Sequence, residues 1–141
     1  MLTREGLPVP ALGPENEPFL AGARESQLLL AHCRSCGQLM APPIAGECRH
    51  CLSEDLEWVA HPGTGSVFSY IRYFKPWVKG FEPYMPYTVA IIELDDGPRF
   101  VSDIVTSDGE AVSVGQRVTV RFEARDQEFV PVFVPSTSGS V

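Results

Sequence analysis

The four cysteines of this chain constrain its fold more than any other feature, because they form two closely spaced pairs. Cys33 and Cys36 are separated by two residues, as are Cys48 and Cys51, and eleven residues lie between the pairs. Two intervening residues let one tight turn direct both sulfurs at a single ion, at about 2.3 Å from it. Two such turns complete a tetrahedron. We therefore predict a metal site that uses all four cysteines as ligands.

The residue types favour a structural zinc ion at this site. Four thiolates also suit iron in a rubredoxin-like site, which stays open as an alternative. Two disulfides would require an oxidising compartment, for which the sequence carries no signal, and a redox C-x-x-C motif requires a βαβ setting that is missing. Gly37 suits a turn with positive φ directly after the second cysteine, whereas Leu52 follows the last cysteine, where glycine is usual. A closed set of four thiolates leaves no position for substrate, so the site is expected to support folding.

Composition and charge narrow the classes of partner. The 141 residues include 11 basic and 18 acidic side chains, for a net charge of −7. Nucleic-acid binders need a basic stripe that neutralises phosphates, and the arginines here are scattered singly, so nucleic acid is disfavoured as a partner. The sequence has no apolar run of membrane-spanning length, and the first residues lack the apolar core of a signal peptide. We expect a cytoplasmic protein with no membrane partner.

The remaining sequence predicts mostly β structure. Asn16, Glu17 and Pro18 are typical of a helix start, and two helical turns are expected to end near Glu25. Residues 27–31 form a short apolar run that predicts a strand before the first cysteine pair. Val118, Val120 and Phe122 alternate with polar residues and are expected to face inward. Pro131 favours an edge position for its strand. Beyond the cysteines we predict strands over residues 65–74, 87–94, 99–105, 117–123 and 129–134.

These elements predict a fold of four parts. Residues 1–26 form an N-terminal arm and a short helix, and residues 27–60 a zinc ribbon. Residues 61–135 form a five-stranded barrel of the OB type, because five strands with no long helix between them suit such a barrel. Residues 136–141 are expected to be a disordered tail.

The segment of residues 73–85, which runs from the end of one predicted strand toward the next, is unusually long and aromatic. It contains the only two lysines of the chain, and long connections of this kind are commonly binding loops. Its aromatic side chains are suited to dock into a partner enzyme, to contact a CoA moiety together with the lysines, or to fold back as core. The candidate binding residues are Tyr73, Phe74, Lys75, Trp77, Lys79, Phe81 and Tyr84.

We predict no catalytic site in the sequence. Gly63 and Gly65 lack the third glycine of a dinucleotide-binding fingerprint, and no G-x-S-x-G, H-E-x-x-H or Walker motif is present. His32 and His50 each neighbour a cysteine and are interpreted as knuckle residues. His61 precedes Pro62 in the expected linker and is interpreted as a turn residue. No acid–base pair clusters in the sequence.

The order of these motifs resembles a family of acyl-CoA-associated proteins in which a rubredoxin-like zinc ribbon precedes an OB-fold. The resemblance runs from about Phe19 to Pro135. It is carried by the Phe19 helix, residues 28–37, Pro42-Pro43, Leu56-Glu57-Trp58-Val59, residues 63–67, residues 86–94, Asp96-Gly97 and Val114-Gly115.

The resemblance implies a companion protein and not an enzyme. Members of the family accompany thiolase-like enzymes, hot-dog enoyl-CoA hydratases or aldolases in acyl-CoA and sterol side-chain metabolism, and have been linked to acyl-CoA binding. We therefore expect a non-catalytic scaffold subunit of a hetero-oligomer, in which the ribbon and the aromatic loop present a surface to the enzyme. The alternatives are a single-stranded nucleic-acid binder, in which the aromatic side chains stack on bases, and a rubredoxin-like electron carrier.

Overall fold

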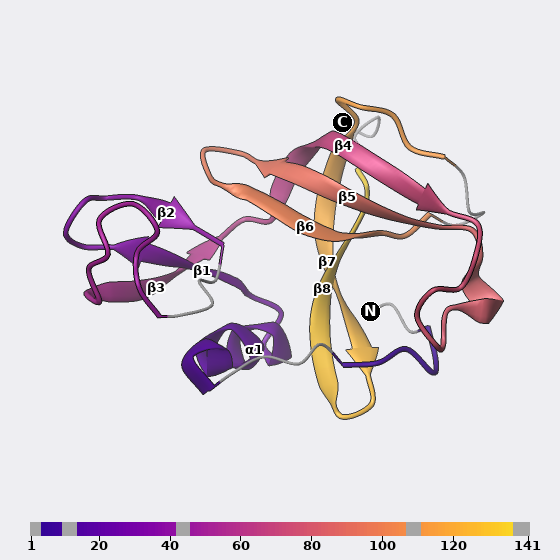
Figure 1. Cartoon of the computed structure of the whole chain (residues 1–141), viewed down its shortest axis with the longest axis horizontal. Coiled ribbons are helices and arrows are strands. Elements are labelled where there is room, and N and C mark those ends of the chain that lie inside the picture. Colours follow the sequence, from indigo (N-terminus) through magenta and orange to yellow (C-terminus); the bar gives the residue numbers. More distant parts are fainter. Residues whose placement is uncertain (1–3, 10–13, 42–45, 107–110, 137–141) are drawn as a thin grey trace.

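The computed structural model of this chain describes residues 4–9, 14–41, 46–106 and 111–136. Figure 1 shows a small three-stranded sheet beside a β-barrel, with a short helix between them. No helix in these ranges has the length and apolar character needed to cross a bilayer. In chain order the elements are η1 (Pro14–Asn16), α1 (Glu17–Arg24), β1 (Leu28–Cys33), β2 (Leu39–Met40), β3 (Leu56–His61), β4 (Thr64–Tyr73), η2 (Glu82–Tyr84), β5 (Tyr87–Leu94), β6 (Arg99–Ile104), β7 (Arg117–Arg125) and β8 (Glu128–Pro135).

The predicted N-terminal helix is confirmed as α1. Asn16 occupies the N-cap position, and Glu17 and Pro18 lie in the first turn, where an acidic side chain and a residue without an N–H group are favourable. Phe19 and Ala23, four residues apart and therefore on one face of the helix, are buried. Ser26, just beyond the helix, has a φ of 60°, which turns the chain toward β1.

The three-stranded sheet has the order β2-β1-β3, and both of its pairings are antiparallel. β1 pairs with β3 from Leu28 opposite His61 to Cys33 opposite Leu56. The central strand β1 therefore ends at the first cysteine, and its partner β3 begins soon after the last one. This arrangement places both cysteine pairs at the same end of the sheet.

The barrel is closed and has the strand order β4-β5-β6-β8-β7, which confirms the predicted five-stranded architecture. Val118 is buried as expected, and Val120 and Phe122 pack against the core while half-buried. β8 pairs with β7 along its length but with β6 through a single residue pair, Ile104 and Phe133. The edge position expected from Pro131 is wrong, because closure of the barrel places β8 between β6 and β7. The proline nevertheless lies in the strand that borders the weakly paired β6–β8 seam.

Helix, ribbon and barrel share one hydrophobic core. Phe19 of α1 and two residues of β1, Leu28 and Leu30, pack with barrel residues in the same buried cluster. The barrel contributes Val67, Ala90, Ile92, Leu94, Phe100, Ile104, Val112, Val118 and Phe133. The ribbon therefore rests on the barrel through apolar side chains, and its position is fixed by packing as well as by the chain connection.

Two sequence expectations fall at the limits of the described ranges. Ser136, the first residue of the expected tail, donates its N–H group to the carbonyl oxygen of Arg117 at 2.9 Å. The rest of that expected tail, residues 137–141, lies outside the described residues, as does the Pro42-Pro43 pair. Of the expected irregular arm, residues 4–9 are described, and they contain no helix or strand.

Candidate metal centre and aromatic loop

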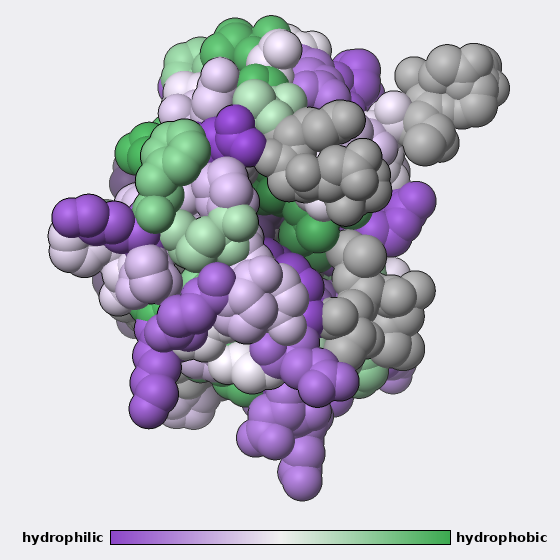
Figure 2. Space-filling model, turned by 90° about the vertical axis from the view of Figure 1, so that its right-hand side faces the viewer, coloured by the Kyte–Doolittle hydropathy of each residue, from purple (hydrophilic) through white to green (hydrophobic). Residues whose placement is uncertain are grey.

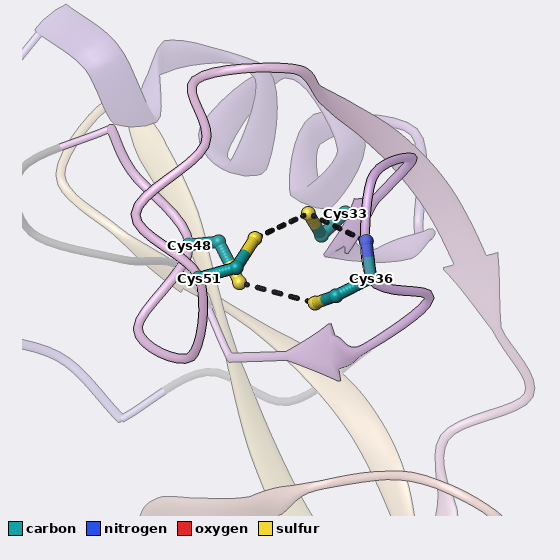
Figure 3. A group of neighbouring side chains, drawn as sticks. All are labelled: Cys33, Cys36, Cys48 and Cys51. Carbon is teal, nitrogen blue, oxygen red and sulfur yellow. Dashed lines mark hydrogen bonds between the residues drawn. The ribbon is translucent and has the colours of Figure 1, made fainter.

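The four cysteine sulfurs converge at one end of the ribbon, as Figure 3 shows. The Sγ atoms of Cys33 and Cys51 lie 3.6 Å apart, those of Cys36 and Cys48 lie 3.5 Å apart, and all four lie within 4.8 Å of one another. A tetrahedral site with metal–sulfur bonds of about 2.3 Å has edges of about 3.8 Å. The donor set and its spacing therefore fit one tetrahedral ion, and all four cysteines are free thiols.

Each of the two turns that carry the cysteines directs a backbone N–H group at the sulfur of its first cysteine. The N–H group of Cys36 points at the sulfur of Cys33 at 3.5 Å, and that of His50 points at the sulfur of Cys48 at 3.3 Å. Backbone N–H groups directed at sulfur favour the thiolate over the thiol. The backbone of the two turns therefore favours the thiolate form of the cysteines, which is the form that binds a cation.

The surroundings of two of the thiols shift their pKa values in opposite directions. Burial tends to raise the pKa of Cys48, but the N–H groups of Cys51 and His50 lower it to about 6. The pKa of Cys36 is raised to about 12: the N–H group of Gln38 lowers it, while burial and the neighbouring sulfurs, led by that of Cys48, raise it. Four sulfurs at this separation repel one another as thiolates, and a divalent ion removes that repulsion.

The surroundings of the cluster support a structural zinc ion. Cys33 and Cys48 are fully buried, and they pack with Ala31 and Met40 in a small apolar cluster. The other two cysteines face outward, so the cluster lies at the surface of the ribbon. Among the described residues this is the one group of three or more cysteine, histidine or acidic side chains placed to hold an ion.

Of the three histidines, His50 lies in the second cysteine turn as interpreted from sequence, whereas the other two readings are wrong: His32 is a half-buried residue of β1 and His61 is the last residue of β3. His32 lies 2.8 Å from a carboxylate oxygen of Glu57 on the neighbouring strand, and His50 is exposed. His61 accepts the N–H group of Gly63 at Nδ1 and donates from Nε2 to the carbonyl oxygen of Asp95, at 2.9 and 2.7 Å. Its ring therefore ties the linker between ribbon and barrel to the β5–β6 turn.

The aromatic segment forms the connection between β4 and β5, at the end of the barrel farthest from the ribbon (Figure 1). Its tip is open to solvent: Phe74 and Trp77 are each 71% exposed, and both lysines are exposed as well. Lys75 Nζ lies over the ring of Trp77 at 5.9 Å. Figure 2, a view of that end of the molecule, shows apolar side chains at the surface among charged ones. Ribbon and loop therefore offer two separate surfaces.

The other aromatic residues of the segment anchor it to the barrel. Phe81 is only 5% exposed and stacks on Tyr87 with ring centroids 4.2 Å apart. Tyr73 stacks on the same ring at 4.9 Å, and the Tyr84 hydroxyl donates to the carbonyl oxygen of Glu5 at 2.7 Å. The candidate residues thus divide into an exposed group of Phe74, Lys75, Trp77 and Lys79 and an anchored base of Tyr73, Phe81 and Tyr84. We define the tip of the loop as the exposed group together with the neighbouring Val78, which is also exposed.

A buried group of charges beside this base was missed by sequence reasoning. Glu123 is fully buried, and it is joined by Asp103, Arg125 and the arm residue Arg4 in one network of ion pairs. The one available signal was that Glu123 and Arg125, two residues apart in a strand, share a face. No local pattern links them to Arg4, which lies 119 residues from Glu123.

The fold and the cysteine cluster define a zinc-ribbon protein with a C-terminal OB-fold. Comparison with known families gives the same result: residues 20–57 match the model described as "ChsH2, rubredoxin-like zinc ribbon domain", and residues 58–123 match "ChsH2, C-terminal OB-fold domain". The chain therefore belongs to the ChsH2 family of zinc-ribbon and OB-fold proteins, also called the DUF35 family.

Three relatives illustrate the range of the family. A probable enoyl-CoA hydratase alpha subunit from Thermomonospora curvata is 35% identical over 130 residues, which cover 92% of this chain but 40% of the relative. A DUF35 domain-containing scaffold protein from Methanothermobacter thermautotrophicus is 34% identical over 98 residues, covering 68% of this chain and 71% of that protein. A solved structure titled "Ltp2-ChsH2(DUF35) aldolase" superposes with a TM-score of 0.77 at 34% identity, covering 90% of this chain and 98% of the matched one.

Proposed function

We propose that this chain is a non-catalytic accessory subunit that binds and completes an acyl-CoA-processing enzyme, and that the tip of the aromatic loop is the contact. One observation carries the proposal. Phe74 and Trp77 are each 71% exposed on a loop whose base is anchored by stacked rings. Large aromatic side chains held out on an ordered base are typical anchors of protein interfaces.

The relatives support this class of partner. One is named as a subunit of an enoyl-CoA hydratase, another as a scaffold protein, and the matched structure is titled as an aldolase that contains a ChsH2 chain. This chain spans 40% of the length of the hydratase subunit that it matches. We therefore propose a thiolase-like enzyme, a hot-dog hydratase or an aldolase as the partner in a hetero-oligomer.

A non-catalytic role agrees with the chemistry of the chain. Cys33, Cys36, Cys48 and Cys51 are proposed as the zinc ligands, and four thiolates around one ion leave no position at which water or substrate is activated. When bound, the ion holds the two turns together. We place the complex in the cytoplasm because reduced thiols are needed for this site.

The proposed mechanism is positional. The tip of the loop covers part of the acyl-CoA channel of the partner, where it excludes water and orders the partner's own loops, and no proton is transferred by this chain. We further propose that Lys75 and Lys79 contact the phosphates of CoA, because both lie on the exposed tip, where Trp77 offers a ring for an adenine to stack against.

An affinity pull-down of the tagged chain from its native extract, followed by mass spectrometry, tests the proposal. We expect a stoichiometric thiolase-like, hydratase or aldolase subunit with the unaltered chain, and a loss on the order of tenfold or more for Trp77→Ala. Val101→Ala is the matched control, since Val101 is also an apolar side chain, 66% exposed, but lies on β6 of the barrel. Recovery of the chain alone, or with nucleic acid that salt removes, would overturn the proposal.

A further inference from the structure

We propose that the N-terminal arm, residues 4–9, is a clamp that holds the aromatic loop in its docking conformation, with Arg4 as the positioning residue. The arm precedes the part of the chain that matches the family models, which begins at residue 20. Its consequence for partner binding rests on the proposed function. The clamp itself is a property of the isolated chain and is measured without any partner.

Two carboxylates of the barrel bind the guanidinium group of Arg4. Its Nε and Nη2 atoms donate to the two carboxylate oxygens of Glu123 at 2.5 and 3.0 Å, and Nη2 also donates to Asp103 at 3.0 Å. Arg125 bonds the same two carboxylates at 2.9 and 3.2 Å, so the group contains two acids and two arginines. The Glu123 side chain is fully buried and that of Arg4 is 11% exposed. Loss of Arg4 would leave a buried negative charge without full compensation.

The same guanidinium group reaches the base of the loop. It lies 5.6 Å from the ring centre of Phe81 and 5.8 Å from that of Tyr84. A cation at this distance is attracted to the face of an aromatic ring. Arg4 therefore joins strands β6 and β7, which carry Asp103 and Glu123, to a loop that connects β4 and β5.

The rest of the arm continues along the loop. Leu7 is 4% exposed and packs in one cluster with Phe81 and Tyr87. Gly80 has a φ of +106°, and a Cβ atom there would collide with the carbonyl oxygen of Gly6. The backbones of arm and loop thus touch directly, and a side chain at Gly80 would separate them.

The hydrogen bonds of the loop show why it needs this support. Among the described residues, those of segment 75–84 join loop residues to one another, apart from the bond that the Tyr84 hydroxyl donates to the carbonyl oxygen of Glu5. Farther along the arm, Arg125 Nη1 donates to the carbonyl oxygen of Pro8 at 3.3 Å. The arm therefore binds the barrel and the loop at once.

Hydrogen–deuterium exchange of the full chain tests the clamp. For Arg4→Ala and Leu7→Ala we expect amide exchange in residues 74–86 to rise on the order of tenfold, with β1 and β3 of the ribbon unchanged. Glu5→Ala is the matched control, because the Glu5 side chain is exposed and the arm contributes only its carbonyl oxygen there. Unchanged exchange in residues 74–86, or an equal rise throughout the barrel, would overturn the proposal.

A more conservative substitution tests the clamp if Arg4→Ala or Leu7→Ala prevents folding. Tyr84→Phe removes one hydroxyl group and its hydrogen bond to the arm while keeping the ring. We expect a several-fold rise of exchange in arm residues 5–9, and unchanged exchange there would count against the clamp.

The partner pull-down separates this proposal from the previous one. If Arg4→Ala increases loop exchange and also reduces recovery of the partner enzyme, both proposals stand. If it increases loop exchange while recovery is unchanged, the clamp stands but partner binding does not depend on it, and docking through the tip is then decided by Trp77→Ala. Trp77→Ala is expected to reduce recovery without increasing exchange in residues 4–9, because its ring is exposed at the tip.

Discussion

Leu52 and Gly37 adopt the same left-handed backbone at equivalent places in the two halves of the metal site. Their φ angles are 64° and 81°. Each donates its N–H group to the carbonyl oxygen of the first cysteine in its pair, Leu52 to Cys48 at 2.9 Å and Gly37 to Cys33 at 2.8 Å. The second turn therefore has the geometry of the first, although its residue carries a side chain that disfavours this conformation.

Leu52→Gly is expected to stabilise the ribbon by about 1 kcal/mol, because a left-handed residue with a Cβ atom costs about that much. Little packing is lost, since Leu52 is 70% exposed. Thermal unfolding and competition with a chelator measure the effect. Leu52→Ala keeps the Cβ atom and is the control, with no comparable gain expected. Equal stability of the glycine and alanine variants would contradict this account.

Gly63→Ala is expected to destabilise the chain by about 2 kcal/mol or more, measured by urea unfolding. Gly63 has a φ of +79°, and a Cβ atom there would overlap the side chain of Val120, whose N–H group donates to the Gly63 carbonyl oxygen. Gly115→Ala is the control: its φ is +89° but nothing lies within 4 Å of the added atom. That variant should cost about 1 kcal/mol. Equal losses in both variants would show that the contact with Val120 is unimportant.

The pairing of Asp95 with Arg117 predicts a stability difference that depends on pH. Hydrogen bonds from Arg117, and then from Thr64, lower the pKa of Asp95 to about 2 from its ordinary value of 3.8. A group with a lowered pKa in the folded chain stabilises the fold above its ordinary value, and this contribution is lost as the pH falls toward 2. Both side chains are more than one-third exposed, so the contribution is discounted for solvent screening to about 1 kcal/mol or less.

Asp95→Asn is therefore expected to unfold at a lower temperature than the unaltered chain above about pH 4, with the difference shrinking between about pH 4 and pH 2. Thermal unfolding of both proteins at each pH measures this, and acid release of the metal affects both equally. A difference that stays constant down to pH 2 would contradict the assignment.

Removal of the metal is expected to weaken the barrel as well as the ribbon. Binding energies on the order of 10–16 kcal/mol are typical of structural zinc in small domains. Leu28 and Leu30 of β1 belong to the barrel core, so loosening of β1 exposes that core. Trp58 packs partly buried against both the barrel core and the cysteine cluster, and it becomes the one tryptophan of the chain in a Trp77→Phe variant.

With a chelator under reducing conditions, we expect a shift of Trp58 emission to longer wavelength and a lower unfolding temperature of the barrel, both reversed by added zinc. Unaltered emission with the metal removed would show that the ribbon folds without it. A lost ribbon signal with an unchanged barrel transition would show that the two parts are not coupled through the core.

Local features of this protein could be read from the sequence. The spacing of the cysteines predicted the cluster, the alternation of Val118, Val120 and Phe122 predicted a barrel strand, and Asn16 and Pro18 marked the helix start. In each case the decisive interactions lie within a few residues, where turn geometry and strand or helix periodicity act.

Tertiary structure alone decided the division of the aromatic loop and the place of the arm. Trp77 and Phe81 are four residues apart and both aromatic, yet one is 71% exposed and the other 5%. Arg4 meets Glu123 across 119 residues because barrel closure brings β7 beside the loop that the arm crosses. Burial and long-range charge pairing depend on which strands become neighbours, and that information is not contained in any local pattern of residues.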